Sequence, residues 1–393
     1  MDIGPKVLLL PLTYWLSLAA VILGVHWLLV AFSLGVRGRR LIRTGAALLL
    51  TDIGLLLGLR AIVGHMGAMD YSETFFRWRW WFLALVLVLA GLPIPLWTLS
   101  IRLTAHVQHD RGSDIPAFSP AFRTALLLWV SSGLIVLAMG GSFTYLPRPA
   151  RLVTYEVSLP DLPAELDGLR IAVLADHHVG PLMTPARARR RLQSLRRARA
   201  DIIVDLGDIT EQDPSYQPEA ARIVGEQTAP LGTFAVAGNF DVQSGTDSLR
   251  QELSGKVTFL ENEAIRVERN GAELWLVGLG DVWTGQGDLD KALANVPKGA
   301  PVILLSHSPD ILDEAIERRI PLVLSGHLHG GQVVIPFAGP VVGMSKFGTR
   351  FAWGHHQIGP THLIVSRGLG EEAVPFRLFC PPEIPIVTLR SPR

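Results

Sequence analysis

The stretch LRIAVLADHH, residues 169–178, decides the fold of the larger part of this 393-residue chain. It is a short aliphatic run that ends in three polar side chains, Asp176, His177 and His178. A continuous apolar run of this length is typical of a strand that is buried on both faces of a sheet. In α/β folds, functional side chains gather just beyond the carboxyl ends of such strands, so residues 176–178 are candidate site residues.

The same pattern recurs toward the C-terminus. Further aliphatic runs are DIIVDLGD (201–208), TFAVAGN (233–239), LWLVGLGD (274–281), PVILLSH (301–307), PLVLSGH (321–327) and HLIVSRG (362–368). Helical stretches separate some of them, beginning at about residue 185 and again near residue 219. Alternation of buried strands with helices predicts a layered α/β fold for residues 150–393.

Five of these runs end in side chains that can bind a metal. The candidate metal ligands are Asp176, His178, Asp208, Asn239, His307, His327 and His329. Each short motif alone is common in satisfied polar loops, but five in succession, each behind a buried strand, indicate a metal site. Carboxylate, amide and imidazole ligands together suit Mn, Fe or Zn. A bridging carboxylate would allow two divalent cations to lower the pKa of a shared water and clamp a phosphoryl group.

The first part of the chain has a different composition. Mean hydropathy is +0.32 over the whole chain, and only 18% of residues are charged, which argues against a single water-soluble domain. Four apolar stretches in residues 1–149, at 7–36, 41–63, 80–101 and 124–146, each exceed the roughly 20 residues that span a bilayer. We therefore expect a four-helix transmembrane anchor. Asp52 in the second stretch suggests either a polar site within the bundle or an interhelical hydrogen bond.

Positive charges in the loops between these stretches predict the orientation of the anchor. Four arginines between residues 37 and 43 mark the first loop as cytoplasmic, which places the N-terminus and residues 150–393 on the other side of the membrane. The expected location is a multi-pass integral membrane protein of the plasma or inner membrane, with an extracytoplasmic catalytic domain. The single cysteine, Cys380, excludes an internal disulfide framework and a cysteine-cluster zinc site.

The motifs of residues 150–393 resemble those of the calcineurin-like metallophosphoesterases, and in particular of the bacterial branch with an N-terminal membrane anchor. The matching segments are Asp176–His178, Gly207–Glu211, Gly238–Asp241, His307 and Gly326–His329, together with SRGLG at 366–370 and CPPEI at 380–384. The resemblance implies a sandwich of two mixed β-sheets flanked by helices. It also implies that Asp176, His178, Asp208 and His329 hold one metal, and that Asp208, Asn239, His307 and His327 hold the other.

One position departs from the family pattern, because Phe240 stands where the family has a histidine after the asparagine. In the family that histidine contacts the phosphate and helps the leaving group depart, and Asp241 would orient it. Three alternatives follow: a substrate with a good leaving group, another imidazole in that role, or weak hydrolysis at a site that mainly binds. His177, His355 and His356 are the candidate imidazoles, and Asp208, Asn239, Asp241 and His177 are the predicted catalytic residues.

The predicted function is hydrolysis of a phosphomonoester, phosphodiester or pyrophosphate by a hydroxide bound to two metals. The substrate is expected to be a phosphorylated small molecule or a lipid, within reach of a membrane-embedded enzyme. The alternative is a metal-binding sensor or scaffold, which Phe240 motivates. Seven arginines between residues 187 and 199 either contact anionic lipid or form a solvated helix face. They lack interleaved aromatic residues, so no nucleic-acid partner is expected.

Overall fold

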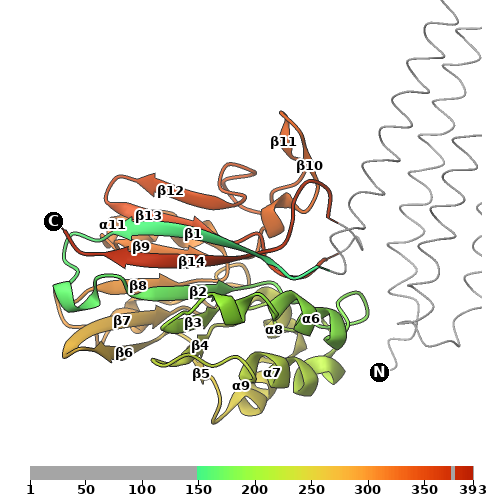
Figure 1. Cartoon of the computed structure of the whole chain (residues 1–393), viewed down its shortest axis with the longest axis horizontal. Coiled ribbons are helices and arrows are strands. Elements are labelled where there is room, and N and C mark those ends of the chain that lie inside the picture. The colour runs from blue at the N-terminus through green and yellow to red at the C-terminus, as the bar shows by residue number, and fades with distance from the viewer. Residues whose placement is uncertain (1–147, 373–376, 393) are drawn as a thin grey trace, which may run out of the picture. The chain divides into compact units, whose positions relative to one another are not determined.

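The computed structural model describes residues 148–372 and 377–392. All of these lie in the second of the two units into which the chain divides, Gly141–Arg393. Two six-stranded sheets dominate this unit, and a separate two-stranded hairpin projects beyond them (Figure 1).

The first sheet has the strand order β1-β14-β2-β3-β4-β5. Its strands are β1 (Arg151–Ser158), β14 (Glu383–Arg390), β2 (Arg170–Leu174), β3 (Ile202–Asp205), β4 (Thr233–Ala235) and β5 (Thr258–Phe259). Strands β2 to β5 run parallel, whereas β14 pairs antiparallel with β2. The sheet is therefore mixed, and the C-terminal strand lies between the two N-terminal ones.

The second sheet has the order β12-β13-β9-β8-β7-β6. Its strands are β12 (Gly354–Ile358), β13 (Thr361–Val365), β9 (Leu322–Ser325), β8 (Val302–Leu305), β7 (Ala272–Gly278) and β6 (Glu263–Arg269). The four inner strands are parallel, and the two edge strands are antiparallel to their neighbours. The separate hairpin consists of β10 (Val334–Ile335) and β11 (Gly339–Pro340).

Successive side chains of the inner strands pack into different hydrophobic clusters, and this produces a layered core. In β2, Ile171 and Val173 join a cluster that contains residues of both sheets, such as Leu276 and Leu305. The intervening Ala172 joins a second cluster on the other face of the first sheet. Successive side chains of a strand point to opposite faces, so a strand buried on both faces must be apolar throughout. The two sheets therefore pack on each other and are also covered on their outer faces.

Short helices cover the outer faces. The first sheet is covered by α6 (Pro185–Leu192), α7 (Gln217–Gly225) and α9 (Thr246–Leu253), and α8 (Asn239–Ser244) begins directly after β4 (Figure 1). The second sheet is covered by α10 (Leu289–Leu293) and α11 (Leu312–Glu317). The predicted sandwich of two mixed sheets with flanking helices is confirmed, and the seven aliphatic runs of the sequence form β2, β3, β4, β7, β8, β9 and β13.

The membrane-spanning part of the predicted fold class is corrected. Within residues 148–372 and 377–392, no helix is long and apolar enough to cross a bilayer. The longest α-helix there, α7, has nine residues, or about 14 Å of the roughly 30 Å of hydrocarbon. The fold class that the described residues show is therefore the two-sheet sandwich. The stretches 7–36, 41–63, 80–101 and 124–146 lie outside the described residues, and the described part gives the predicted multi-pass membrane location no support.

Candidate metal centre

The polar side chains at the strand ends come together as two groups. Asp176, His178 and His329 form the first, and Asp208, His307 and His327 form the second. In each group the candidate ligand atoms all lie within 4.8 Å of one another, and all six residues are buried. Residues separated by as many as 153 positions thus share one site, as the carboxyl ends of parallel strands predict.

Asp208 lies between the two groups. Its Oδ2 is 3.5 Å from His178 Nε2 and 3.2 Å from His307 Nε2. Its Oδ1 accepts a hydrogen bond of 2.8 Å from the backbone N–H of Phe240. Asn239, the seventh predicted ligand, joins the second group, because its Oδ1 lies 3.2 Å from His307 Nε2. One carboxylate oxygen therefore faces imidazoles of both groups, as a bridging ligand would.

Each group takes side chains from both sheets. In the first, Asp176 and His178 follow β2 of the first sheet, whereas His329 follows β9 of the second. In the second group, Asp208 follows β3 of the first sheet, and His307 and His327 follow β8 and β9 of the second. The centre is thus assembled where the two sheets meet.

The backbone at the ligands is unusual. Five candidate ligands have positive φ angles: Asp176 (54°), His178 (48°), Asp208 (52°), His327 (70°) and His329 (50°). Left-handed conformations cost energy for residues with a Cβ, and they concentrate at functional sites. Here they allow the chain to turn sharply at the end of each strand, which aims the side chains into the centre.

Burial and neighbouring charges set the protonation of the site. Burial raises the pKa of Asp176 to about 7 and lowers the pKa of His178 to about 4 and of His327 to about 3. Burial also acts against the charge of Asp208, but His307 and His178 outweigh it and hold the pKa of that carboxyl at about 2. The pKa of His307 is raised to about 10, because Asp208 outweighs the effect of burial. A metal requires neutral imidazoles beside ionised carboxylates. His178, His327 and Asp208 are already in those states, whereas a cation would have to displace protons from His307 and Asp176.

A buried oxygen atom without a hydrogen-bond partner also indicates that the site fits a cation. Asp176 Oδ2 is buried and has no hydrogen-bond partner, whereas Asp176 Oδ1 accepts from the backbone N–H of His327 at 2.9 Å. The Nε2 atoms of His178 and His329 lie only 3.0 Å apart. A buried carboxylate oxygen without a donor is costly unless a cation or proton occupies its side. The residues present therefore suit divalent cations.

Comparison with known proteins shows which family has this fold and these candidate ligands. The model of the calcineurin-like phosphoesterase family matches residues 169–331. An uncharacterized metallophosphoesterase of Aquifex aeolicus (strain VF5) is 32% identical over 256 residues, which cover 61% of this chain and 92% of that protein. This chain belongs to the calcineurin-like phosphoesterase family. It is a metallophosphoesterase, a hydrolase that acts on phosphoric ester bonds.

Two further relatives match this phosphoesterase over smaller shares of their own length. The phosphodiesterase YaeI of Escherichia coli (strain K12) is 32% identical, over 48% of this chain and 70% of its own length. A zebrafish (Danio rerio) protein named a transmembrane protein with a metallophosphoesterase domain is 29% identical, over 74% of this chain and 68% of its own length. Bacterial and animal proteins both match, so the bacterial assignment remains a prediction.

The departure at Phe240 is visible in the phosphoesterase site. The Phe240 ring meets the His178 ring edge-on, with centroids 4.7 Å apart, and the side chain is buried. Asp241 is fully buried, and its carboxylate accepts from the backbone N–H groups of Ile209, Thr210 and Gly238 at 3.0–3.1 Å. Asp241 thus fastens the loop after β3 to the start of α8, and this contact holds Asp208 and Asn239 in place without any histidine at position 240.

The imidazoles that could replace the missing one lie elsewhere. His177 is buried, and its Nε2 is 2.7 Å from Asp205 Oδ2; Asp205 raises the pKa of this imidazole against the effect of burial. His355 contacts His362 at 2.9 Å, and His356 contacts the carbonyl of Trp353 at 2.9 Å. Each of these rings has a partner outside the two metal groups. The catalytic role considered for His177 therefore stays an untested prediction.

Several site residues were not singled out from the sequence. Glu211 Oε2 is 3.7 Å from His178 Nδ1, and Glu372 Oε2 is 3.7 Å from His329 Nε2. Arg377 is fully buried and donates to the carbonyls of His329 and Arg367 at 3.1 Å and 2.7 Å. Glu211 ends a motif that the sequence displays, so it could have been found. Glu372 and Arg377 follow no strand pattern and have no sequence signal.

The basic helix has a structural explanation. Arg187 and Arg191 of α6 both pair with the fully buried carboxylate of Glu371, at 2.5 Å and 2.7 Å. Arg189 pairs with Glu219 of α7 at 2.8 Å. These ion pairs tie α6 to its neighbours, so three of the seven arginines are engaged within the domain.

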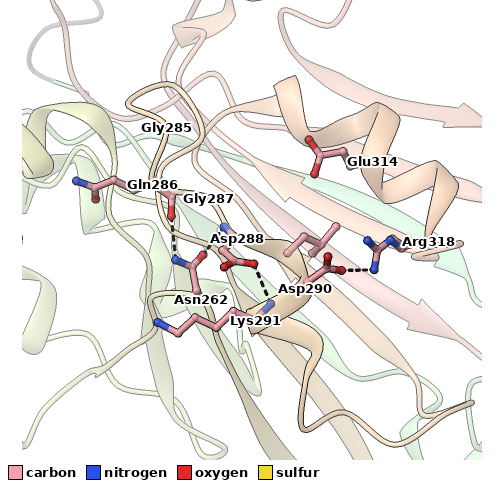
Figure 2. A pocket seen from close by; sticks show the side chains of 10 residues that line it. Asn262, Gly285, Gln286, Gly287, Asp288, Asp290, Lys291, Glu314 and Arg318 are labelled. Atoms are coloured by element: carbon pink, nitrogen blue, oxygen red, sulfur yellow. Dashed lines mark hydrogen bonds and ion pairs between the residues drawn. The ribbon is translucent and has the colours of Figure 1, made fainter.

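A separate hollow of about 510 Å³ lies between the loop before α10 and α11 (Figure 2). Asn262 donates to the carbonyl of Gln286 at 2.8 Å, Asp288 accepts from the backbone of Lys291 at 2.9 Å, and Asp290 pairs with Arg318. The hollow contains none of the candidate ligands. It lies apart from the metal groups, so we assign it no role in the chemistry.

Proposed function

We propose that this metallophosphoesterase hydrolyses a phosphomonoester, phosphodiester or pyrophosphate at the centre formed by Asp176, His178, Asp208, Asn239, His307, His327 and His329. The observation that carries the proposal is the position of Asp208 Oδ2 between His178 and His307. A carboxylate shared by two ligand groups is the arrangement that a two-cation centre needs. The mixture of oxygen and nitrogen ligands favours Mn, Fe or Zn.

Two divalent cations held there would activate a water molecule and neutralise charge on the phosphoryl oxygens. The side chains prepare the site for this chemistry. Asp241 holds the loops that carry Asp208 and Asn239. The His307 imidazole is fixed by a 2.8 Å contact between its Nδ1 and the carbonyl of Leu206, which leaves Nε2 toward Asp208 and Asn239. In the reaction, the water oxygen bonds to phosphorus and its proton passes to solvent, the bond from phosphorus to the leaving oxygen breaks, and the leaving oxygen departs with its electron pair.

The leaving group receives no imidazole from position 240. We therefore propose a substrate whose leaving group needs little protonation, such as an aryl or phosphoryl oxygen. A positioned acid contributes about 10²–10⁴-fold to such a step. The site is accordingly expected to hydrolyse activated diesters much faster than alkyl monoesters.

The test is hydrolysis of bis-p-nitrophenyl phosphate by metal-depleted protein after addition of Mn²⁺. Asp208→Asn and His329→Ala should each abolish most of the turnover, because each removes a candidate ligand. Asp247→Asn, an exposed carboxylate on α9, is the matched control and should keep it. Equal activity in all four proteins would mean that the hydrolysis comes from a contaminant, and the proposal would be abandoned.

A second candidate function is a metal-binding sensor or scaffold, and the buried position of Phe240 against His178 favours it. That function requires the protein to bind two equivalents of Mn²⁺ without turning over any phosphate ester. Calorimetric titration of Mn²⁺ beside the activity assay separates the two functions.

A further inference from the structure

The exposed large apolar side chains of the described residues are concentrated in few segments. Five of the seven lie in the segment VVIPFAGPVVGM, residues 333–344, and the other two are Trp283 and Phe379. No side chain of residues 333–344 is polar. Phe337, between β10 and β11, is fully exposed. We call residues 333–344, together with Trp283 and Phe379, the apolar rim.

The apolar rim is attached directly to the metal centre. His327 Nε2 lies 3.1 Å from the carbonyl oxygen of Met344, and this leaves His327 Nδ1 toward His307, 3.2 Å away. The Trp283 ring lies 4.9 Å from the His327 ring, centroid to centroid. The rim segment begins four residues after His329. A group bound at the centre is therefore within reach of the rim.

The rim is held in an ordered arrangement. Val334 donates to the carbonyl of Leu378 at 2.9 Å, and Val341 donates to the carbonyl of Val333 at 3.0 Å. Phe337 and Phe379 have φ angles of 69° and 51°, which are costly for bulky residues. The hairpin β10–β11 stands clear of both sheets (Figure 1). Strained backbone at two exposed phenylalanines indicates a surface shaped for contact, since a loop without a ligand could relax.

We propose that the apolar rim binds a hydrocarbon chain of the substrate, so that the enzyme acts on phosphate esters that carry an alkyl or acyl group. This inference rests on the proposed function. Its geometric basis is that the rim adjoins His327 and His329, where the phosphoryl group would lie, and that residues 333–344 offer no charged or hydrogen-bonding side chain. Sugar or nucleoside groups would leave their hydroxyls and ring nitrogens unpaired on such a surface, whereas a hydrocarbon chain leaves nothing unpaired.

A hydrocarbon chain of the substrate fits the apolar rim better than a second protein copy or a bilayer does, for a physical reason. A second protein copy or a lipid bilayer would also cover apolar side chains, but neither would need the carbonyl of Met344 to fix a candidate metal ligand. The contact between rim and ligand couples recognition of the apolar group to the geometry of the centre. A substrate chain is the occupant for which this coupling affects turnover.

The experiment uses the full-length protein loaded with Mn²⁺ and a series of p-nitrophenyl alkyl phosphodiesters, from methyl to octyl, below their critical micelle concentrations. In the wild type, kcat/KM should rise by about two- to fourfold for each added methylene, the value expected for partial to full burial. Phe337→Ser and Ile335→Ser should flatten this dependence on chain length. Phe337→Leu is the matched control, because it keeps an apolar side chain and should keep the dependence.

A dependence that is flat in the wild type, or that persists unchanged in both serine variants, would overturn the proposal. Sedimentation with vesicles of phosphate-free lipid tests the bilayer as occupant. Binding that Phe337→Ser abolishes, together with a flat dependence on chain length, would assign the rim to a bilayer and likewise overturn it. Failure of the proposed function would look different, because the methyl ester itself would then not be hydrolysed.

Discussion

Restoring an imidazole at position 240 tests how this enzyme manages without the family's histidine. The substitution Phe240→His changes only the side chain, since the hydrogen bond to Asp208 comes from the backbone N–H of residue 240. The introduced ring would occupy the place of the phenyl ring, whose centroid is 4.7 Å from that of His178. That position borders the first metal group, so the imidazole is expected to reach the leaving oxygen of a bound ester.

The substitution Phe240→His has two opposing effects, one on folding stability and one on the reaction rate. The Phe240 side chain is 8% exposed, and exchanging it for imidazole gives up apolar burial of about 1–3 kcal/mol in folding stability. A positioned acid is worth about 10²–10⁴-fold in rate, or about 2.7–5.4 kcal/mol of activation free energy. The first effect lowers the free energy of unfolding, whereas the second lowers the activation barrier of the step in which the leaving group departs. Turnover of substrates with poor leaving groups should therefore rise although the protein melts earlier.

The assay compares kcat for an aryl and an alkyl phosphomonoester in the wild type, Phe240→His and Phe240→Leu. Phe240→His should raise kcat for the alkyl ester by at least about tenfold and change kcat for the aryl ester little. Phe240→Leu controls for the loss of the ring and should show no gain. An unchanged ratio of alkyl to aryl turnover in Phe240→His would refute the reasoning, and would mean that another group already protonates the leaving oxygen.

Three further predictions follow from burial in and around the centre. The pKa of Asp176 is raised to about 7 and that of His307 to about 10, so a bound cation must displace protons, and the affinity for Mn²⁺ should rise between about pH 6 and pH 8. Calorimetry in buffers of different ionisation enthalpy measures the number of protons released. An affinity that does not change with pH would contradict this prediction. Glu371→Ala removes the carboxylate that two α6 arginines share and should lower the free energy of unfolding in urea by about 3–5 kcal/mol, whereas a loss below about 1 kcal/mol would show that the cluster is dispensable. Gly368→Ala would place a Cβ 2.5 Å from Asp176 Oδ2 and should weaken Mn²⁺ binding, unlike the control Gly359→Ala, which has a similar positive φ but nothing within 4 Å; equal affinities would count against the crowding argument.

The inner strands could be predicted from the sequence because they depend on local pattern, and the same pattern places the candidate ligands at the strand ends. Strands such as β3 and β8 are buried at every residue, and they therefore read as unbroken aliphatic runs. Each ligand follows such a run directly, so its place at the sheet edge could be inferred without knowing the pairing. Edge strands are different. In β12, half-buried and exposed residues mix, and the segment GHHQI has no strand pattern.

The contacts that complete the centre could not be predicted, because they depend on how distant loops pack. Glu372 approaches His329, and Arg377 donates to the His329 carbonyl, from a segment that precedes β14. Nothing in the spacing of these residues specifies that packing. The basic helix was open to two interpretations for the same reason, since its partner Glu371 lies 180 residues away from Arg191. The predicted membrane-spanning stretches follow from hydropathy and lie outside the described residues, in which no helix is long and apolar enough to cross a bilayer.

That each candidate group draws on both sheets has a consequence for biosynthesis. Asp176 and Asp208 are translated early, but the partner that completes the first group, His329, comes 153 residues after Asp176. A nascent chain on the ribosome therefore carries only two of the three residues of the first group and one of the three of the second until the second sheet has emerged and docked. An ion bound afterwards would link residues at the two ends of this long segment, and the entropic cost of bringing the ends of a loop together grows with loop length. Metal content would then report that the two halves of the domain have found each other.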